Sequence, residues 1–178
     1  MTHEMKVAIV RDAAHSVFET MLGVTLKNCE PTREENAPVH TDGVVSLVGL
    51  AGDWAGTGGF RCSADMARKI SGLMLMQEFP AVDQDVLDAV GEITNMILGN
   101  VKTTFEETLG PMGLSIPTVI YGRNFTTRSV GHNEWTVVPF ELDGEVFEIQ
   151  ISLAQRQHGR SAGSAQQAHV SSVSAMEP

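Results

Sequence analysis

Residues 84–109, QDVLDAVGEITNMILGNVKTTFEETL, carry the longest helical pattern in the chain and decide its fold. Apolar residues recur every three or four positions, as a helix with one buried side requires. Those at the centre of this side are Val90, Ile93, Ile97 and Val101. Gly110 and Pro111 come directly after, and this pair is typical of a helix C-terminus. The pattern therefore predicts one long helix with a single apolar side.

The opposite side of this helix carries Asp88, Glu92 and Asn95 in one row that points away from the core, with Gly91 and Gly99 beside it. A surface that only contacts water accounts for polar residues here. Asn and Gly are nevertheless poor helix formers, and Gly costs about 1 kcal/mol relative to Ala. Small residues also let the backbone of a partner approach closely. The composition of the row thus also suits a docking surface with a few fixed polar groups, and at this point both interpretations stay open.

The segments before the long helix predict two further helices and a hairpin. Residues 6–22 form an amphipathic pattern that places Met21 on the core side, and Gly23 is a plausible terminator. Residues 24–29 predict a short strand, and EPTREENAP at 30–38 has the composition of a loop. Ser63 is a favoured N-cap for the next helix, whose predicted core residues are Met66, Ile70, Leu73 and Met74.

A β-hairpin is predicted between these helices, with strands at 44–50 and around Phe60 and a Gly-rich connection between them. The stretch 44–60 contains Gly49, Gly52, Gly56, Gly58 and Gly59, which invite comparison with a phosphate-binding loop. The connection has no GKS or GKT and precedes a strand, so it does not match such a loop.

The segments after the long helix read as strands. LSIPTVIYG at 114–122 is interrupted by Pro117, which is typical of an edge or bulged strand. Two alternating runs come next, at 134–142 and 145–153, and Asp143-Gly144 between them predicts a hairpin. The fold class is therefore α/β in the mixed α+β sense, a largely antiparallel sheet with long helices packed on it. We expect one domain over residues 1–154 and a disordered Ser/Ala/Gln-rich tail over 155–178.

Composition excludes several function classes. Twelve basic and 22 acidic residues give a formal charge of −10, which argues against binding to nucleic acid or to an anionic membrane. No signal peptide or spanning segment is recognisable, so a cytoplasmic location is expected. The six histidines have no paired ligand spacing, which predicts no metal site. Cys29 and Cys62 are read as free thiols in preference to a disulfide.

The polar row and Pro117 resemble the signature of the bacterial chemotaxis phosphatases, the family that includes CheC, CheX and FliY. That signature is Asp or Ser, three residues, Glu, two residues, Asn, twenty-one residues and Pro. Asp88, Glu92, Asn95 and Pro117 match it at full spacing. The single copy of the motif resembles the CheX branch. The resemblance implies a CheX/CheC-like fold and a homodimer.

The resemblance also implies an activity, which is hydrolysis of the aspartyl phosphate of a response regulator, CheY or a relative. Asn95 would position the attacking water, because a carboxamide both donates and accepts hydrogen bonds without charge. Glu92 would form a salt bridge to the active-site lysine of the regulator, which would also hold Mg²⁺, so no cofactor of this chain's own is expected. Asp88, Gly91, Gly99 and Pro117 would support the row or contact the partner.

Two alternatives remain open at this point. The same helix would serve a non-catalytic module that binds a response regulator or acts as a scaffold, although such a module has no need of Asn95. In an unrelated dimeric structural domain, the row would simply be solvated surface.

Overall fold

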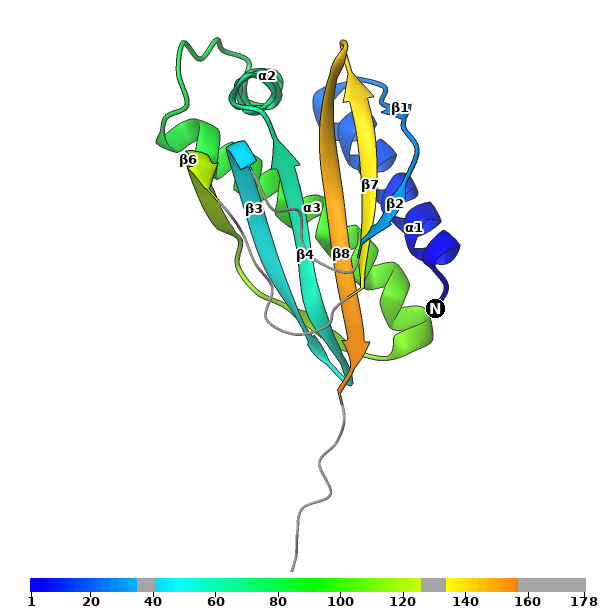
Figure 1. Ribbon diagram of the computed structural model, residues 1–178. Helices are drawn as coiled ribbons and strands as arrows, with labels where there is room; N and C mark the ends of the chain where they lie inside the picture. Colours follow the sequence, from blue (N-terminus) through cyan, green and yellow to red (C-terminus); the bar gives the residue numbers. More distant parts are fainter. Residues whose placement is uncertain (35–40, 126–133, 157–178) are drawn as a thin grey trace, which may run out of the picture.

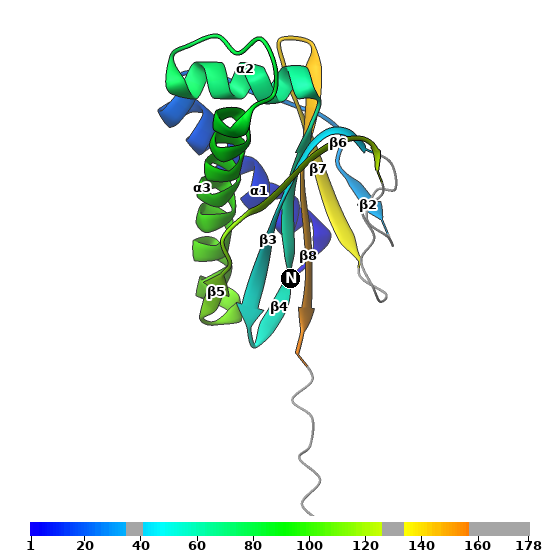
Figure 2. The same cartoon turned by 90° about the vertical axis from the view of Figure 1, so that its left-hand side faces the viewer.

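The computed structural model describes residues 1–34, 41–125 and 134–156. Within these residues, eight strands form one antiparallel sheet, and the helices lie together on one of its faces (Figure 1; Figure 2). The predicted fold class is therefore confirmed. The predicted tail lies outside the described residues from 157 onward, and Gln155 is still part of the last strand.

The helical elements are α1 (His3–Val17), the π-helical turn η1 (Phe18–Leu22), α2 (Ala64–Leu75) and α3 (Gln84–Leu109). The strands are β1 (Lys27–Asn28), β2 (Thr32–Glu34), β3 (Thr41–Gly52), β4 (Trp54–Cys62), β5 (Met112–Leu114), β6 (Thr118–Phe125), β7 (Trp135–Leu142) and β8 (Glu145–Gln155).

The sheet has a four-stranded centre in the order β7-β8-β4-β3, and short strands complete both edges. At one edge β1 and β2 both pair with β7, and at the other β5 and β6 both pair with β3. The loop predicted over 30–38 is therefore wrong at Thr32–Glu34, and the strand predicted over 24–29 is limited to Lys27–Asn28. Pairing with β7 sets where these two strands begin and end.

Helix α3 has the bounds that its sequence predicts. The Asp83 side chain accepts a hydrogen bond of 3.0 Å from the backbone N–H of Val86 and so caps the N-terminus. At the other end Gly110 has a positive φ of 82°. The residues on its predicted apolar side are buried: Val90, Ile93, Ile97, Leu98, Val101 and Phe105. This side lies on the sheet, so the opposite side of α3 faces outward (Figure 2).

The hairpin of β3 and β4 differs from its prediction, because only Asp53 separates the two strands. The glycines of the predicted connection lie within the strands instead, Gly52 in β3 and Gly56, Gly58 and Gly59 in β4. Gly58 shows the reason: a Cβ built there would meet Leu98 Cδ1 of α3 at 2.6 Å. The missing side chain lets α3 approach the sheet closely, which no local pattern in the strand reveals.

The predicted core sides of α1 and α2 need one correction each. Met21 is 48% exposed, and Leu22 is buried in its place, because the π-helical turn adds a residue and rotates the positions that come after it. Leu73 of α2 is 38% exposed, whereas Met66 and Ile70 are buried as predicted. The Ser63 cap is confirmed, since its hydroxyl accepts a hydrogen bond of 3.0 Å from the N–H of Met66.

Candidate functional site

The row predicted on α3 is present on the outward side of the helix. Asp88 and Glu92 are exposed, and Asn95 is half-buried. These residues succeed one another at intervals of four and three, which brings their side chains together on successive turns. Because α3 is anchored to the sheet along its whole apolar side, the row has a rigid base.

Glu92 and Asn95 have no internal partner among the residues that the structure describes. Within the described part of the chain, neither side chain makes a hydrogen bond or an ion pair. Asp88 differs, since one of its carboxylate oxygens accepts a hydrogen bond of 2.8 Å from Gln84 Nε2, one turn earlier. The carboxylate of Glu92 and the carboxamide of Asn95 therefore keep their full hydrogen-bonding capacity for an external molecule.

Pro117 lies beside the row, far from it in sequence. A Cβ built at Gly91 would be 3.8 Å from Pro117 Cβ and 3.3 Å from Val119 Cγ2. Gly91 is buried, so its small size accommodates the chain's own β6 segment rather than a partner. At Gly99, by contrast, a built Cβ would meet no atom of the described residues within 4 Å beyond its chain neighbours and the backbone of its own helix. The open space that the sequence suggested beside the row thus exists at Gly99 and not at Gly91.

The segment that carries Pro117 is held to the sheet by Ser115, a residue that the sequence did not single out. Its backbone N–H donates to the carbonyl oxygen of Gly49 at 2.9 Å. Its side-chain oxygen accepts a hydrogen bond of 2.9 Å from the N–H of Gly49 and donates to the carbonyl of Ile116. These three bonds fix the backbone just before Pro117. The sequence LSIPT contains no signal that would have predicted them.

The C-terminal end of α3 is held in place by a pair of charged residues, Lys102 and Glu106. Lys102 Nζ lies 2.7 Å from Glu106 Oε2, and the N–H of Met112 donates to Glu106 Oε1 at 2.7 Å. These bonds hold the pKa of the Glu106 carboxyl below its ordinary value. Lys102 is therefore already paired, and it leaves Glu92 without a cation from its own helix.

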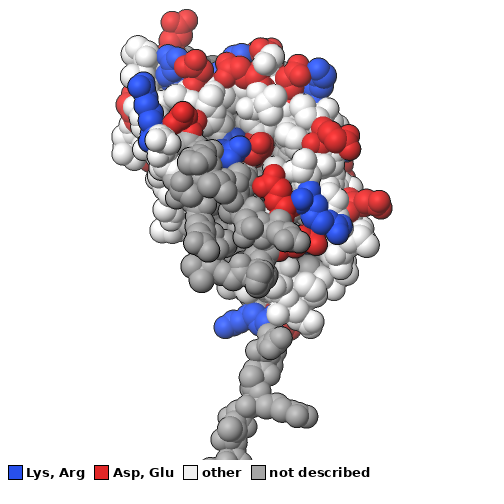
Figure 3. All heavy atoms as spheres, viewed as in Figure 1, with Lys and Arg blue, Asp and Glu red and all other residues white. Residues whose placement is uncertain are grey.

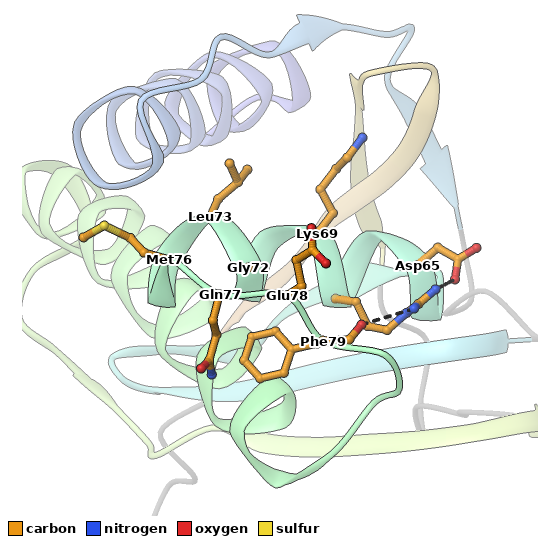
Figure 4. Close-up of a pocket in the computed structure, with 9 residues that line it drawn as sticks. Asp65, Lys69, Gly72, Leu73, Met76, Gln77, Glu78 and Phe79 are labelled. Carbon is orange, nitrogen blue, oxygen red and sulfur yellow. Dashed lines mark hydrogen bonds and ion pairs between the residues drawn. The ribbon is translucent and has the colours of Figure 1, made fainter.

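Apart from the row, a hollow lies between α2 and the segment that leads into α3, and its residues are shown in Figure 4. Its two cationic side chains are both neutralised. Arg68 binds Asp65 and donates to the carbonyl oxygens of Phe79 and Pro80, and Lys69 lies 2.9 Å from Asp143 Oδ2. Because both of these cations are already paired, this hollow is a poor site for a phosphorylated substrate.

Cys62 does not provide a second reactive group. Cys29 and Cys62 are both free. Cys62 is buried, and its burial, together with the nearby Glu145 carboxylate, raises the pKa of its thiol. The thiol is therefore protonated at neutral pH and is not a nucleophile.

The surface charge and the side chains that could bind metal complete the description of the molecule outside the row. On the face shown in Figure 3, acidic and basic side chains are interspersed over the residues that the structure describes. No group of three or more His, Cys, Asp or Glu side chains in residues 1–34, 41–125 and 134–156 is placed to hold a metal ion. Among the same residues, no helix is long and apolar enough to cross a membrane.

Comparison with known proteins identifies the family. The family model described as chemotaxis phosphatase CheX matches residues 44–141, more than half of the chain. The chain belongs to the CheX family. The matched region contains both the row on α3 and Pro117, so the resemblance that rested on four residues extends over most of the sheet and two helices.

Individual CheX proteins are similar over most of this chain. A curated relative from Thermotoga maritima, named CheY-P phosphatase CheX, is 28% identical over 131 residues, which make up 71% of this chain and 84% of the relative. The structure of the chemotaxis protein CheX from Desulfovibrio desulfuricans has a TM-score of 0.74 and 25% identity, with 84% of this chain and 99% of the other covered. The CheX-CheY-BeF3-Mg²⁺ complex from Borrelia burgdorferi has a TM-score of 0.72 and 28% identity, with 83% and 97% covered.

Proposed function

We propose that this CheX-family protein dephosphorylates the aspartyl phosphate of a CheY-like response regulator. The observation that carries the proposal is the pair Glu92 and Asn95, which stand on the outward side of a rigid helix without partners among the described residues. Two comparisons support it. The Thermotoga relative is named as a CheY-P phosphatase, and the Borrelia relative was crystallised with CheY, BeF3 and Mg²⁺.

In this reaction the phosphatase itself need not form a covalent bond with the phosphoryl group. In an acyl phosphate the leaving carboxylate is already good, so the remaining task is to place a water in line with phosphorus. The water oxygen forms the new P–O bond, the bond to the aspartyl oxygen breaks, and the proton of the water passes to the released phosphate. Asn95 orients this water, since its carboxamide can accept from the water and donate to a phosphoryl oxygen.

Glu92 has a docking role in this proposal. A carboxylate close to an anionic phosphoryl group is repelled unless a cation stands between them, so Glu92 is a poor general base. Paired with the active-site lysine of the regulator, the same carboxylate orients the two proteins. The regulator supplies that lysine, the phosphate and the Mg²⁺, and this chain supplies the two side chains on α3.

The function is tested by measuring phosphate release from a phosphorylated regulator in the presence and absence of the protein. We expect the rate of phosphate release to rise in proportion to the concentration of the protein, even when the protein is present in much smaller amounts than the regulator. Binding to the regulator without acceleration would instead favour the non-catalytic binding module. Absence of both binding and acceleration with every cognate regulator would reject the proposal.

Replacement of Glu92 by glutamine is expected to raise KM for the phosphorylated regulator about tenfold or more, with a smaller change in kcat. The substitution keeps the shape of the side chain and removes the charge that pairs with lysine. Pairs of this kind at an interface are worth about 2 kcal/mol or more when one partner is removed. Initial rates over a range of regulator concentrations separate the two constants.

Glu107→Gln is the matched control for this experiment, because Glu107 is also exposed on α3 but lies about four turns further along the helix. We expect its KM to stay within about twofold of that of the wild type. If Glu92→Gln lowered kcat at unchanged KM, Glu92 would act in the chemical step and not in docking.

A homodimer is a separate expectation, because the family resemblance implies one. Light scattering at micromolar concentration is expected to give about twice the 19.2 kDa mass of one chain. A mass equal to that of one chain over this concentration range would contradict the dimer and would leave the phosphatase proposal intact.

A further inference from the structure

Ile116 is the most exposed large aliphatic side chain among the described residues apart from Met76. It is 86% exposed. A single exposed apolar residue is common on protein surfaces and by itself indicates nothing. The informative feature of Ile116 is that its backbone is fixed on both sides, in front by Ser115 and behind by Pro117.

The backbone before Ile116 is held by the three hydrogen bonds that Ser115 makes with Gly49 and with the Ile116 carbonyl. Pro117 restricts the conformation after it, and Pro117 lies against α3 at Gly91. An apolar side chain on such a support loses little conformational entropy when a partner covers it. It is therefore a preorganised contact, which is the kind that contributes most to affinity.

The position of Ile116 relative to the candidate site decides what covers it. Gly91 precedes Glu92 directly and stands one turn before Asn95. A surface that reaches Glu92 and Asn95 therefore meets the Ile116–Pro117 segment on the same approach. A second copy of this chain seated on Ile116 would cover the row and exclude the regulator, so the regulator itself is the occupant that fits.

We propose that Ile116 is an apolar anchor for the response regulator, which it contacts beside the phosphorylation site while Glu92 and Asn95 enter that site. This inference rests on the proposed function and specifies how the partner is bound. The row supplies orientation through two polar side chains and removes little apolar area from water. Burial of an isoleucine side chain supplies the affinity that the row lacks.

The test compares Ile116→Gln with Met5→Gln. Met5 is 46% exposed on α1, which lies on the opposite side of the molecule from β6 (Figure 1). The probe is the regulator held in its phosphorylated form by beryllium fluoride and Mg²⁺, and calorimetry measures its dissociation constant. We expect the constant to rise about tenfold for Ile116→Gln and by less than about twofold for Met5→Gln. At regulator concentrations well below KM, phosphate release should slow in the same proportion for Ile116→Gln and should stay at the wild-type rate for Met5→Gln.

Each outcome bears on one of the two proposals. An unchanged dissociation constant for Ile116→Gln, with normal phosphatase activity, overturns the anchor and leaves the function standing. Weaker binding of this variant to the regulator, in a protein whose wild type does not accelerate phosphate release, supports the anchor and rejects catalysis. Equal weakening by both variants also overturns the anchor, since Met5 lies outside the proposed contact.

Discussion

Asn95→Ala is expected to reduce the acceleration of phosphate release by about a hundredfold or more, while binding to the regulator stays within about twofold of the wild type. Asn95 contributes the only uncharged side chain in the row that both donates and accepts hydrogen bonds. Without it, the attacking water has no group on α3 to hold it in line with phosphorus. Loss of one such positioning contact typically costs about 10²-fold or more in rate.

The substitution should not disturb the fold. Alanine is a better helix former than asparagine, and the Asn95 side chain makes no hydrogen bond within the described residues that would be lost. The measurement is phosphate release at saturating regulator, with the dissociation constant of the beryllium fluoride form determined in parallel. The two numbers separate chemistry from docking.

Asn95→Asp provides a sharper control, because aspartate has nearly the same shape but carries a charge and only accepts hydrogen bonds when ionised. We expect it to be as inactive as Asn95→Ala, since the added carboxylate repels the phosphoryl group. Wild-type rates in either variant would show that Asn95 does not position the water. Another residue of the row would then have to do so.

Phe147→Ala is expected to lower the free energy of unfolding by about 3–5 kcal/mol, the range for removal of a large buried aromatic side chain. Phe147 of β8 is 1% exposed. Its ring stacks on those of Phe18 and Phe60 with centroids 5.1 Å apart, and on that of Phe140 at 5.5 Å. It thereby joins the end of the first helical segment to three central strands.

Urea denaturation monitored by circular dichroism measures this change. Domains are stable by roughly 5–15 kcal/mol in total, so the variant loses a large fraction of its stability, and Phe147→Leu provides a milder substitution if it does not fold. Val146→Ala is the matched control, because Val146 is the neighbouring residue on β8 and is 52% exposed. We expect it to change the stability by less than about 1 kcal/mol. Equal losses for Phe147 and Val146 would contradict the role of the aromatic cluster.

The sequence predicts best those parts of the fold that depend on neighbours along the chain. The hairpin of β7 and β8 is predicted by Asp143-Gly144, whose φ angles of 50° and 83° place both residues in the left-handed region that such a turn requires. At one edge of the sheet β2 was missed and β1 was predicted too long, because both strands owe their bounds to pairing with β7.

The candidate site likewise has one part that the local sequence predicts and one part that depends on contacts between distant segments. The spacing of Glu92 and Asn95 predicts that they share one side of a helix, and the structure places them there. That Pro117 lies against Gly91, and that Ile116 is held beside the row, depends on β6 crossing next to α3. The long separation between Gly91 and Pro117 in the chain carries no information about such a contact unless a family pattern supplies it.

The sequence by itself determined the bounds of α3, its buried side and its outward row, because capping and the helical repeat are properties of consecutive residues. Four residues at fixed intervals also predicted the family, which the match over residues 44–141 then identified. Only the tertiary structure decided what the glycines do. Gly58 makes room for Leu98, Gly91 makes room for Val119, and Gly99 faces open space among the described residues. A glycine has no side chain from which to infer its neighbours, so its role appears only when the facing element is in place.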